Sequence, residues 1–591
     1  MFPPMSSDRV RWLLLAVAAG VLVAHSLTFN FVTDDAYISF VFSRNLAEHG
    51  ELSFNLGHPV EGYTNFLWTV LIALGMLLGI APEVSSRVLG LACALGTLYV
   101  VFRLTERVLG RPSAWAAVPP LLLACSSGFA CWTSGGLETQ LFTLLVVIAL
   151  DGVVDAVQRP RAIIRAGIAL ALAAMTRPEG LLVAGVLGLV QFSTIVSTYQ
   201  AYRKWPSRVV DLIGAGLFLG LWAPWFYWRY RYYGYLWPNT YYVKAAGPWI
   251  DPKLEVEMYT NGVHYLWVWL GQTKLLYAAP FAVIGMLLGR TRTPRFVLGA
   301  ASLLLTLTYL PYVITVGGDF MGLHRFIMPM FVIAAVAVTL GLEWTMHLER
   351  RQRRLWSGGV ALAALIVIGL GRIEPAIAYF GPSAVGLVGF SLVFATLALV
   401  PDHLRRIAAA IVGTLVVCAF AVTQYQLTRA QLRWGNFDND RGIDTPAFLI
   451  VYTEDRAAIG RAMAPCFAPD DFSIVGGAGA QPYYGRMQGI DVFGLVSERI
   501  AHDEPRIRAR AGHTKFGTDA LLAEYDPTFV FSCYQLHAKA EPQPHLPCAG
   551  YWLAHGYEQV TMHIPGMRQA GEYYTFLAKR ARNFQCPGRV P

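Results

Sequence analysis

The stretch that decides the fold is RWLLLAVAAGVLVAHSLTFNFVTDDAY, residues 11–37. Its apolar run from Trp12 to Phe31 has the length of about 20 residues that a helix needs to cross a bilayer. A secretory signal peptide is the alternative interpretation, but the run lacks a clear small-residue cleavage site and many further apolar runs follow. We therefore expect a retained first membrane helix, with the adjacent carboxylates of Asp34 and Asp35 just beyond its end.

The composition extends this interpretation to the whole chain. Of the 591 residues, 55% are hydrophobic and only 14% are charged, and the mean hydropathy is +0.44. A soluble domain carries about 25% charged residues, so the bilayer must be the solvent for much of this chain. The net charge of +9 does not indicate nucleic-acid binding, because the arginines form short clusters between apolar runs, as they do in cytoplasmic loops.

Thirteen segments are long and apolar enough to span. They are 12–32, 86–108, 113–131, 137–154, 161–175, 179–197, 210–229, 272–289, 296–316, 326–345, 355–372, 383–400 and 407–425. Residues 64–80 are also apolar, and the charge pattern decides their role. Basic clusters lie at Arg9/Arg11, Arg103/Arg107/Arg111, Arg159/Arg161/Arg165, Arg203/Lys204/Arg208, Arg290/Arg292/Arg295, Arg350/Arg351/Arg353/Arg354 and Arg405/Arg406.

If all these clusters face the cytoplasm, an even number of crossings must separate neighbouring clusters. That condition holds only if 64–80 does not cross, so we expect interfacial or re-entrant helices on the outer side at about 36–80. The predicted fold is a polytopic α-helical membrane module, residues 1–425, with about 13 transmembrane helices. Residues 426–591 then form an extracytoplasmic domain.

This tail is richer in polar residues, and its apolar runs are short. DFSIVGGAG (471–479) and PTFVFSCY (527–534) predict strands, and TEDRAAIGRAMA (453–464) predicts a helix capped by Thr453. About 165 residues suffice for one soluble α/β domain. The tail also holds Cys466, Cys533, Cys548 and Cys586. Outside the cytoplasm these favour two disulfides, with the pairing left open.

With this threading, polar residues from distant segments fall on the outer side. They are Asp34, Asp35, Glu61, Thr64, Asn65, Glu138, Arg177, Glu179, Trp237, Asn239, Lys244, Asp319, His324 and Arg325. Charged groups at a membrane boundary are costly unless they are paired or hydrated, so such a gathering predicts a site.

Asp34 and Asp35 are the sharpest signal. Two neighbouring carboxylates raise each other's pKa, which suits a general base that takes a proton from an alcohol. The pair also suits a divalent metal held through oxygen ligands. The alternative is that one aspartate caps a helix beginning near Tyr37 while the other is solvated.

The cations Arg177, Lys244 and Arg325 suit a lipid phosphate. The alternative is that Arg177 and Arg325 form structural ion pairs with Glu179 or Glu138 and with Asp319, respectively. His324 suits a proton shuttle or, more simply, a solvated hydrogen bond. Trp237 lies within a polar motif and suits stacking on a sugar, whereas the other tryptophans fit an interfacial belt.

TDDAY, NFLWTVLIALG and TRPEG together resemble the GT-C superfamily of membrane glycosyltransferases. Within it, DDAYISFVFSRNLAEHG, NLGHPVEGYTN, VGGDFMGLHRFIMP and GIDVFGLVSERIA are most similar to the AftB family, the terminal arabinofuranosyltransferases of the mycobacterial cell wall. The resemblance implies a polyprenyl-phosphate sugar donor, with arabinofuranose as the sugar, and transfer to a glycan hydroxyl at the periplasmic face of the bacterial inner membrane. It also implies catalytic roles for Asp34 and Asp35, donor-phosphate binding by Arg325 with Arg177 or Lys244, and a tail domain that helps to hold the acceptor.

Other functions stay open at this stage. A lipid-linked sugar transferase acting on pilin or lipopolysaccharide fits the same residues. A lipid-linked glycan transporter should carry charges near the bilayer midplane and inverted repeats, which this sequence lacks. A non-catalytic glycan-binding protein would leave the two aspartates unexplained.

Overall fold

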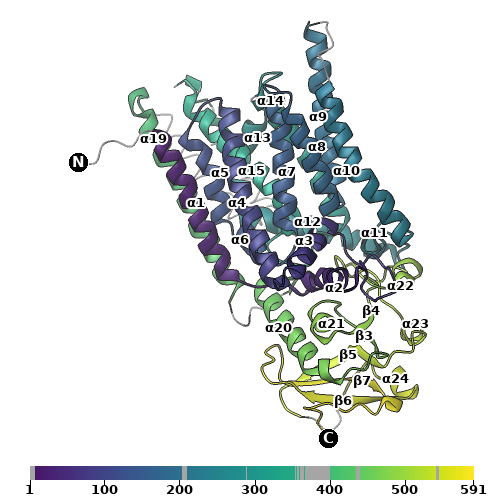
Figure 1. Cartoon of the computed structure of the whole chain (residues 1–591). Coiled ribbons are helices and arrows are strands. Elements are labelled where there is room, and N and C mark those ends of the chain that lie inside the picture. Colours follow the sequence, from purple (N-terminus) through teal and green to yellow (C-terminus); the bar gives the residue numbers. More distant parts are fainter. Residues whose placement is uncertain are drawn as a thin grey trace.

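A helical bundle and a smaller sheet domain make up the chain (Figure 1). The computed structural model describes residues 7–202, 209–287, 289–349, 400–433, 435, 439–540 and 545–590, with single residues between 351 and 365. The bundle consists of α1 (Ser7–Phe29), α4 (Pro82–Leu109), η1 (Ala114–Ala117), α5 (Val118–Cys125), α6 (Ser127–Ser134), α7 (Thr139–Asp155), α8 (Ala162–Thr176), α9 (Glu179–Tyr202), α10 (Val209–Tyr233), α13 (Leu275–Leu287), α14 (Pro294–Thr315), α15 (Met328–His347) and α19 (Arg405–Gln431).

The predicted spans in the described part of the chain coincide with helices over most of their length, but 113–131 and 272–289 are each interrupted. Among the described helices, seven are long and apolar enough to cross a bilayer, or eight if the pair around Cys125 and Ser127, bent by 64°, is one span. The chain is therefore a membrane protein that crosses the bilayer several times. The predicted spans 355–372 and 383–400 lie outside the described residues, so the count of thirteen stays a prediction.

Arginines from four of the predicted cytoplasmic clusters pair with carboxylates near the C-terminal ends of α4, α7 and α15. Arg107 pairs with Asp155 at 2.6 Å and with Asp151 at 3.1 Å, while Arg111 pairs with Glu343 at 3.0 Å. Figure 1 shows the sheet domain at the opposite end of the bundle. One end of the bundle is thus rich in paired arginines, and the other carries the sheet domain.

Four further helices lie between the bundle and the sheet domain (Figure 1). They are α2 (Asp34–His49), α3 (Phe66–Leu77), α11 (Asn239–Ala245) and α12 (Pro252–Thr273). The 12-residue α3 occupies the apolar segment 64–80 and is too short to span, in line with the predicted outer-side helix. Helix α12 was not predicted from the sequence, although Asp251 accepts a hydrogen bond from Lys253 N and so caps this helix.

The sheet domain has five strands in the order β4-β3-β5-β7-β6. They are β3 (Phe472–Val475), β4 (Gln488–Asp491), β5 (Phe529–His537), β6 (Tyr557–His563) and β7 (Tyr573–Lys579). The first three are parallel, and β7 pairs antiparallel with both β5 and β6. A separate two-stranded pair joins β1 (Asn439–Asp440) to β2 (Ile443–Asp444). The two predicted strands match β3 and β5.

The predicted helix start at Thr453 is wrong. Helix α20 (Pro446–Met463) begins eight residues earlier and is capped by Thr445, whose hydroxyl accepts from Phe448 N at 3.3 Å. Thr453 lies inside this helix and donates its hydroxyl to Leu449 O at 2.7 Å. The smaller helices of the domain are η4 (Ala464–Cys466), α21 (Ala480–Gly485), α22 (Glu498–Asp503), α23 (Asp519–Ala523), α24 (Gly550–Ala554) and η5 (Arg580–Arg582).

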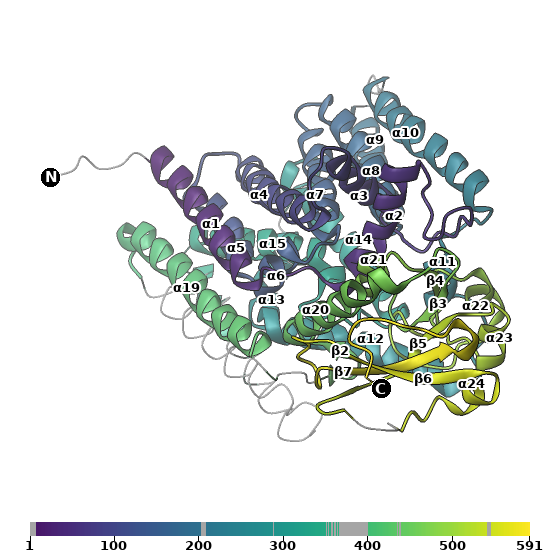
Figure 2. The same ribbon diagram turned by 60° about the horizontal axis from the view of Figure 1, so that its bottom comes forward.

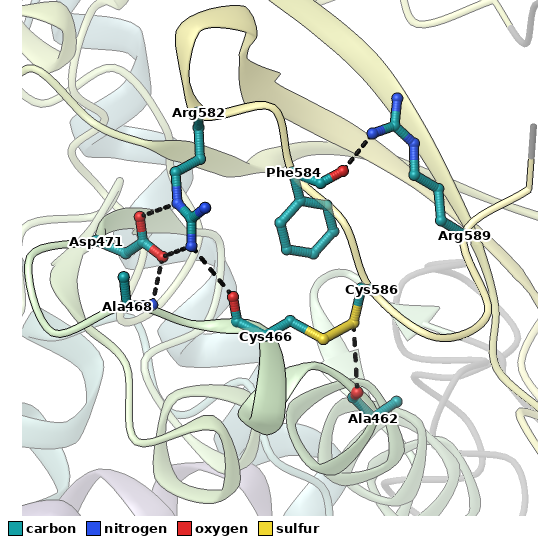
Figure 3. The surroundings of a disulfide bond; sticks show 8 residues. All are labelled: Ala462, Cys466, Ala468, Asp471, Arg582, Phe584, Cys586 and Arg589. Carbon is teal, nitrogen blue, oxygen red and sulfur yellow. Dashed lines mark hydrogen bonds and ion pairs between the residues drawn. A yellow bond between two sulfur atoms is a disulfide. The ribbon is translucent and has the colours of Figure 1, made fainter.

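Two disulfides close the domain. Cys466 bonds to Cys586 across 120 residues, and Cys533 bonds to Cys548 across 15. Figure 3 shows the first disulfide beside the ion pair of Arg582 with Asp471. A cross-link that closes a long loop removes much entropy from the unfolded chain, so the first disulfide ties the C-terminal segment to the rest of the domain.

Candidate functional site

A cavity of about 540 Å³ opens between the sheet domain and the end of the bundle that faces it. Many of the predicted polar residues line it together, although they come from separate segments of the chain. These lining residues are Asp35, Thr64, Asn65, Glu138, Arg177, Glu179, Trp237, Lys244 and Arg325. The cavity wall also carries apolar side chains from the start of α9 and the end of α14, among them Leu182 and Val316.

Asp35 faces the cavity next to Arg325. The Arg325 guanidinium lies 3.9 Å from Asp35 Oδ2, while its Nε donates to Asp319 Oδ2 at 2.5 Å. Asp319 is 4% exposed and lies behind Arg325, so it fixes the direction of the guanidinium without lining the cavity. Burial raises the pKa of Asp35, and the positive charges of Arg325 and Lys244 oppose that shift.

Lys244 brings a second cation to the same wall from α11. Among the described residues, its ammonium has no hydrogen-bond or ion-pair partner, and it lies close enough to Asp35 and Asp319 to feel their charges. Burial lowers the pKa of Lys244, and the neighbouring Arg325 lowers it further. Two converging cations, one without a protein partner, form a site suited to an anion.

Arg177 is held differently. Its guanidinium donates to Glu138 Oε1 at 2.6 Å and to Glu179 Oε1 at 2.9 Å. Asn65 donates to the second oxygen of Glu138 at 2.8 Å, and the Tyr312 hydroxyl donates to Glu179 Oε1 at 2.8 Å. The ion-pair alternative is therefore present in the structure for Arg177, as it is for Arg325 with Asp319. All three guanidinium nitrogens of Arg177 donate to these two carboxylates, so Arg177 has less to offer a phosphate than Arg325, of which two nitrogens are engaged by Asp319.

We predict that Arg177→Gln destabilises the protein strongly. The change would leave Glu138 and Glu179 buried without their shared cation, and breaking a buried ion pair costs about 3–5 kcal/mol. The measurement is thermal unfolding of the full chain in detergent. Arg486→Gln is the matched control, because Arg486 and Glu48 form an exposed pair on the same side of the molecule. Equal unfolding temperatures for the two variants would contradict this prediction.

Asp34 points away from the cavity, although it directly precedes Asp35. Its Oδ1 accepts a hydrogen bond from Ala480 N of the sheet domain at 2.8 Å. Burial raises the pKa of Asp34 to about 6, and the Ala480 N–H opposes this shift. The structure therefore separates two carboxylates that the sequence analysis treated as one catalytic pair.

Glu61 and Asn239 also lie behind the cavity wall. Arg229 binds both carboxylate oxygens of Glu61, at 2.8 and 2.5 Å. The Asn239 side chain donates to Gly494 O at 2.7 Å and to Leu495 O at 3.0 Å. These contacts join α10 to the loop before α3, and α11 to the sheet domain, so both residues shape the site rather than face its contents.

His324 is buried rather than solvated. Its Nε2 lies 3.0 Å from Gln272 Oε1, and burial lowers its pKa to about 3. It lines a separate small pocket of about 20 Å³ together with Trp269 and Gln424. A neutral, buried imidazole that does not line the large cavity does not suit the predicted proton shuttle.

The sequence analysis missed several residues of the cavity wall. Glu255 and Tyr259 come from α12, and the Tyr259 hydroxyl donates to Glu255 Oε1 at 2.9 Å. Arg506 comes from the sheet domain and lies over the ring of Trp249. The helix-start signal Asp251-Pro252 could have located α12. No local pattern marks Arg506.

The two aspartates do not fit a divalent metal. One oxygen of Asp34 accepts a hydrogen bond from Ala480 N, and Asp35 faces the Arg325 guanidinium at 3.9 Å. In the part of the chain that the structure describes, no group of three His, Cys, Asp or Glu side chains is placed to hold a metal ion. We therefore derive no catalytic step through a metal.

Comparisons with known proteins agree with the fold. No protein-family model matches the chain. A curated protein of Corynebacterium glutamicum, described as a terminal beta-(1->2)-arabinofuranosyltransferase, is 28% identical over 358 residues, which are 54% of this chain. The chain spans about half the length of that relative, 49%. The crystal structure of ArnT from Cupriavidus metallidurans in the apo state matches with a TM-score of 0.54 and 15% identity, covering 96% of this chain and 98% of that one.

The whole-chain likeness to ArnT concerns the fold alone, and the partial likeness to the Corynebacterium protein concerns the sequence. Both agree with the motifs on which the resemblance was first based. This chain is thus similar in sequence to a terminal arabinofuranosyltransferase and in fold to ArnT, in agreement with its resemblance to the GT-C superfamily.

Proposed function

We propose that this chain is a membrane glycosyltransferase. It transfers D-arabinofuranose from a polyprenyl-phosphate donor to a hydroxyl of a cell-envelope glycan on the periplasmic face of the inner membrane. The observation that carries the proposal is the cavity in which Asp35 lies beside the cations Lys244 and Arg325. A carboxylate and an anion site side by side are what such a transfer requires.

The reaction follows from these groups. Lys244 and Arg325 would neutralise the donor phosphate, so that the bond between the sugar C1 and the phosphate oxygen can break while charge develops on the leaving group. The acceptor oxygen forms the new bond to C1, and its proton passes to Asp35. The pKa of Asp35 is raised by burial, which improves its match to a general base near neutral pH.

The shape of the cavity supports a lipid donor. Apolar side chains of α9 and of the end of α14 line the same cavity as the cations, and α9 and α14 are both candidate spans. A polyprenyl chain could therefore remain in the bilayer while its phosphate reaches Lys244. The cavity is also lined by Trp237, which precedes α11, and by Arg506 of the sheet domain, and we place the acceptor glycan next to these two residues.

The choice of arabinofuranose rests on the printed name of the Corynebacterium relative and on the shared motifs. Transfer of another sugar to pilin or lipopolysaccharide would use the same groups. A transporter is disfavoured because the charges of this cavity lie at helix ends on one side of the bundle rather than at its middle.

The periplasmic orientation is supported by two features. The arginine-rich loops lie at the end of the bundle opposite the sheet domain, as expected for cytoplasmic loops. The sheet domain holds two disulfides, which persist in oxidising compartments such as the periplasm.

The direct test is an in vitro assay with purified full-length protein and synthetic polyprenyl-phosphate donors carrying arabinofuranose or glucose. We expect transfer of arabinofuranose to a synthetic arabinan acceptor. Transfer of glucose alone would keep the enzyme class and overturn the sugar. Absence of transfer from either donor, with a folded protein, would contradict the proposed function.

Orientation is tested by labelling single cysteines with a membrane-impermeant maleimide, in a background where Cys418 is replaced by Ser because it is exposed. His58→Cys, on the exposed loop before α3, should react in intact spheroplasts, whereas Thr291→Cys, between α13 and α14, should react only after lysis. The reverse pattern would place the cavity in the cytoplasm.

A further inference from the structure

The first turn of α2 is held from two sides. On the side of the bundle, Thr33 N donates to Gly135 O at 3.1 Å, in the turn between α6 and α7. On the side of the sheet domain, Ala480 N donates to Asp34 Oδ1 at 2.8 Å. Figure 2 shows α21, which begins at Ala480, next to α2. Asp35 is the next residue of this turn.

A glycine-rich loop, residues 476–479, follows β3 and packs closely against Asp34. A Cβ atom added to Gly479 would lie 2.2 Å from the backbone oxygen of Asp34 and 2.4 Å from its Cγ. At Gly477 the added Cβ would lie 3.1 Å from Asp34 Oδ2. The backbone of the loop therefore approaches Asp34 so closely that a side chain at Gly479 would collide with it, which explains why glycine is required there.

A buried arginine also lies close to the Asp34 carboxylate. Arg456 of α20 is 3% exposed, and its positive charge favours the ionised form of Asp34. The Tyr452 hydroxyl lies next to the same loop, 2.9 Å from a Cβ added at Gly477. Asp34 thus meets groups from two elements of the sheet domain, and its carboxylate is not among the groups that line the cavity.

From these contacts we infer that Asp34 is a positioning residue. It fixes the first turn of α2 to the sheet domain and thereby holds Asp35 at its distance of 3.9 Å from Arg325. This inference rests on the proposed function of Asp35. It also gives the sheet domain a part in forming the catalytic site, in addition to any contact with the acceptor.

The test compares four variants of the full-length enzyme. Asp34→Ala removes the acceptor of the Ala480 hydrogen bond, and Gly479→Ala pushes the loop away without changing any cavity residue. A misplacement of about 1 Å costs up to a hundredfold in rate, so we expect both variants to lose about 30- to 100-fold in kcat. The KM for the lipid donor should stay unchanged, because Lys244 and Arg325 are intact.

Two variants separate positioning from general damage. Asp34→Asn keeps an oxygen that can accept from Ala480 N, so we expect it to retain activity within about tenfold of the parent. Gly476→Ala is the matched control in the same loop, because an added Cβ there meets nothing closer than 4.0 Å. This control should behave like the parent. Rescue by asparagine would not be expected for a catalytic carboxylate.

Hydrogen exchange of the full chain supplies a readout that does not depend on activity. Faster exchange in residues 34–40 of Gly479→Ala than of Gly476→Ala supports the positioning role even if the assayed sugar is wrong. Equal exchange in these two variants, or full activity of Asp34→Ala, would overturn the inference. Inactivity of Asp34→Asn as complete as that of Asp35→Asn would overturn it as well, by making Asp34 catalytic.

Discussion

Asp35→Asn is expected to reduce the rate of sugar transfer by more than about a hundredfold, as removal of a general base does. Among the described residues, no protein group donates a hydrogen bond to Asp35, so its oxygens are available to an acceptor hydroxyl. Glu138 and Glu179 line the same cavity, but Arg177 holds them both. The measurement is kcat for the purified variant with saturating lipid donor.

Glu255→Gln is the matched control for this variant. Glu255 also lines the cavity, and its carboxylate accepts a hydrogen bond from Tyr259. If Asp35 is the base, the Glu255 variant should keep most of its kcat and change mainly the KM for the acceptor. Loss of activity in Glu255→Gln together with full activity in Asp35→Asn would show that the general base is Glu255 of α12 and not Asp35.

The apolar helices of the bundle were predictable because the causes of a membrane-spanning helix are local. A run of about 20 apolar residues predicts a span wherever it occurs, and arginines at the run ends predict its direction. The same reasoning kept 64–80 from crossing, and the short α3 agrees with it. The gathering of the polar motifs was predictable as well, because charged residues at the helix ends on one side of a bundle must lie near one another.

Relations between distant residues were not predictable in this way. Arg229 is 168 residues from Glu61, and Ala480 is 446 residues from Asp34. Nothing in TDDAY indicates that one carboxylate turns to the sheet domain and the other to the cavity. That division depends on a glycine loop in another domain, which can be recognised as a contact only once the fold brings the two segments together.

The ion-pair partners of the cations could not be predicted from the sequence either. The sequence analysis weighed phosphate binding against structural ion pairs for Arg177 and Arg325, and residue types alone could not separate these roles. The structure gives Arg177 two carboxylate partners and leaves Lys244 without one among the described residues. Lys244 is therefore the cation that we expect to contribute most to binding of the donor phosphate.

Lys244→Met is expected to weaken donor binding and, at the same time, to stabilise the protein. A hydrogen bond to a charged group contributes about 1.5–3 kcal/mol, so the KM for the lipid donor should rise about 10- to 100-fold. Burial lowers the pKa of Lys244 in the folded protein, so keeping its charge at neutral pH costs folding free energy. Methionine removes that cost and fills a similar space, so the unfolding temperature should rise.

The sign of the stability change is what makes this prediction specific. A buried lysine with a structural ion pair would lower the unfolding temperature when replaced, whereas an anion-binding lysine without its ligand would raise it. Adding undecaprenyl phosphate should stabilise the parent more than the Lys244 variant, because a ligand stabilises in proportion to its affinity for the folded state. Lys253→Met, exposed on α12, is the control and should change neither quantity. An unchanged donor KM in Lys244→Met would remove Lys244 from the phosphate site and leave Arg325 as the cation next to Asp35.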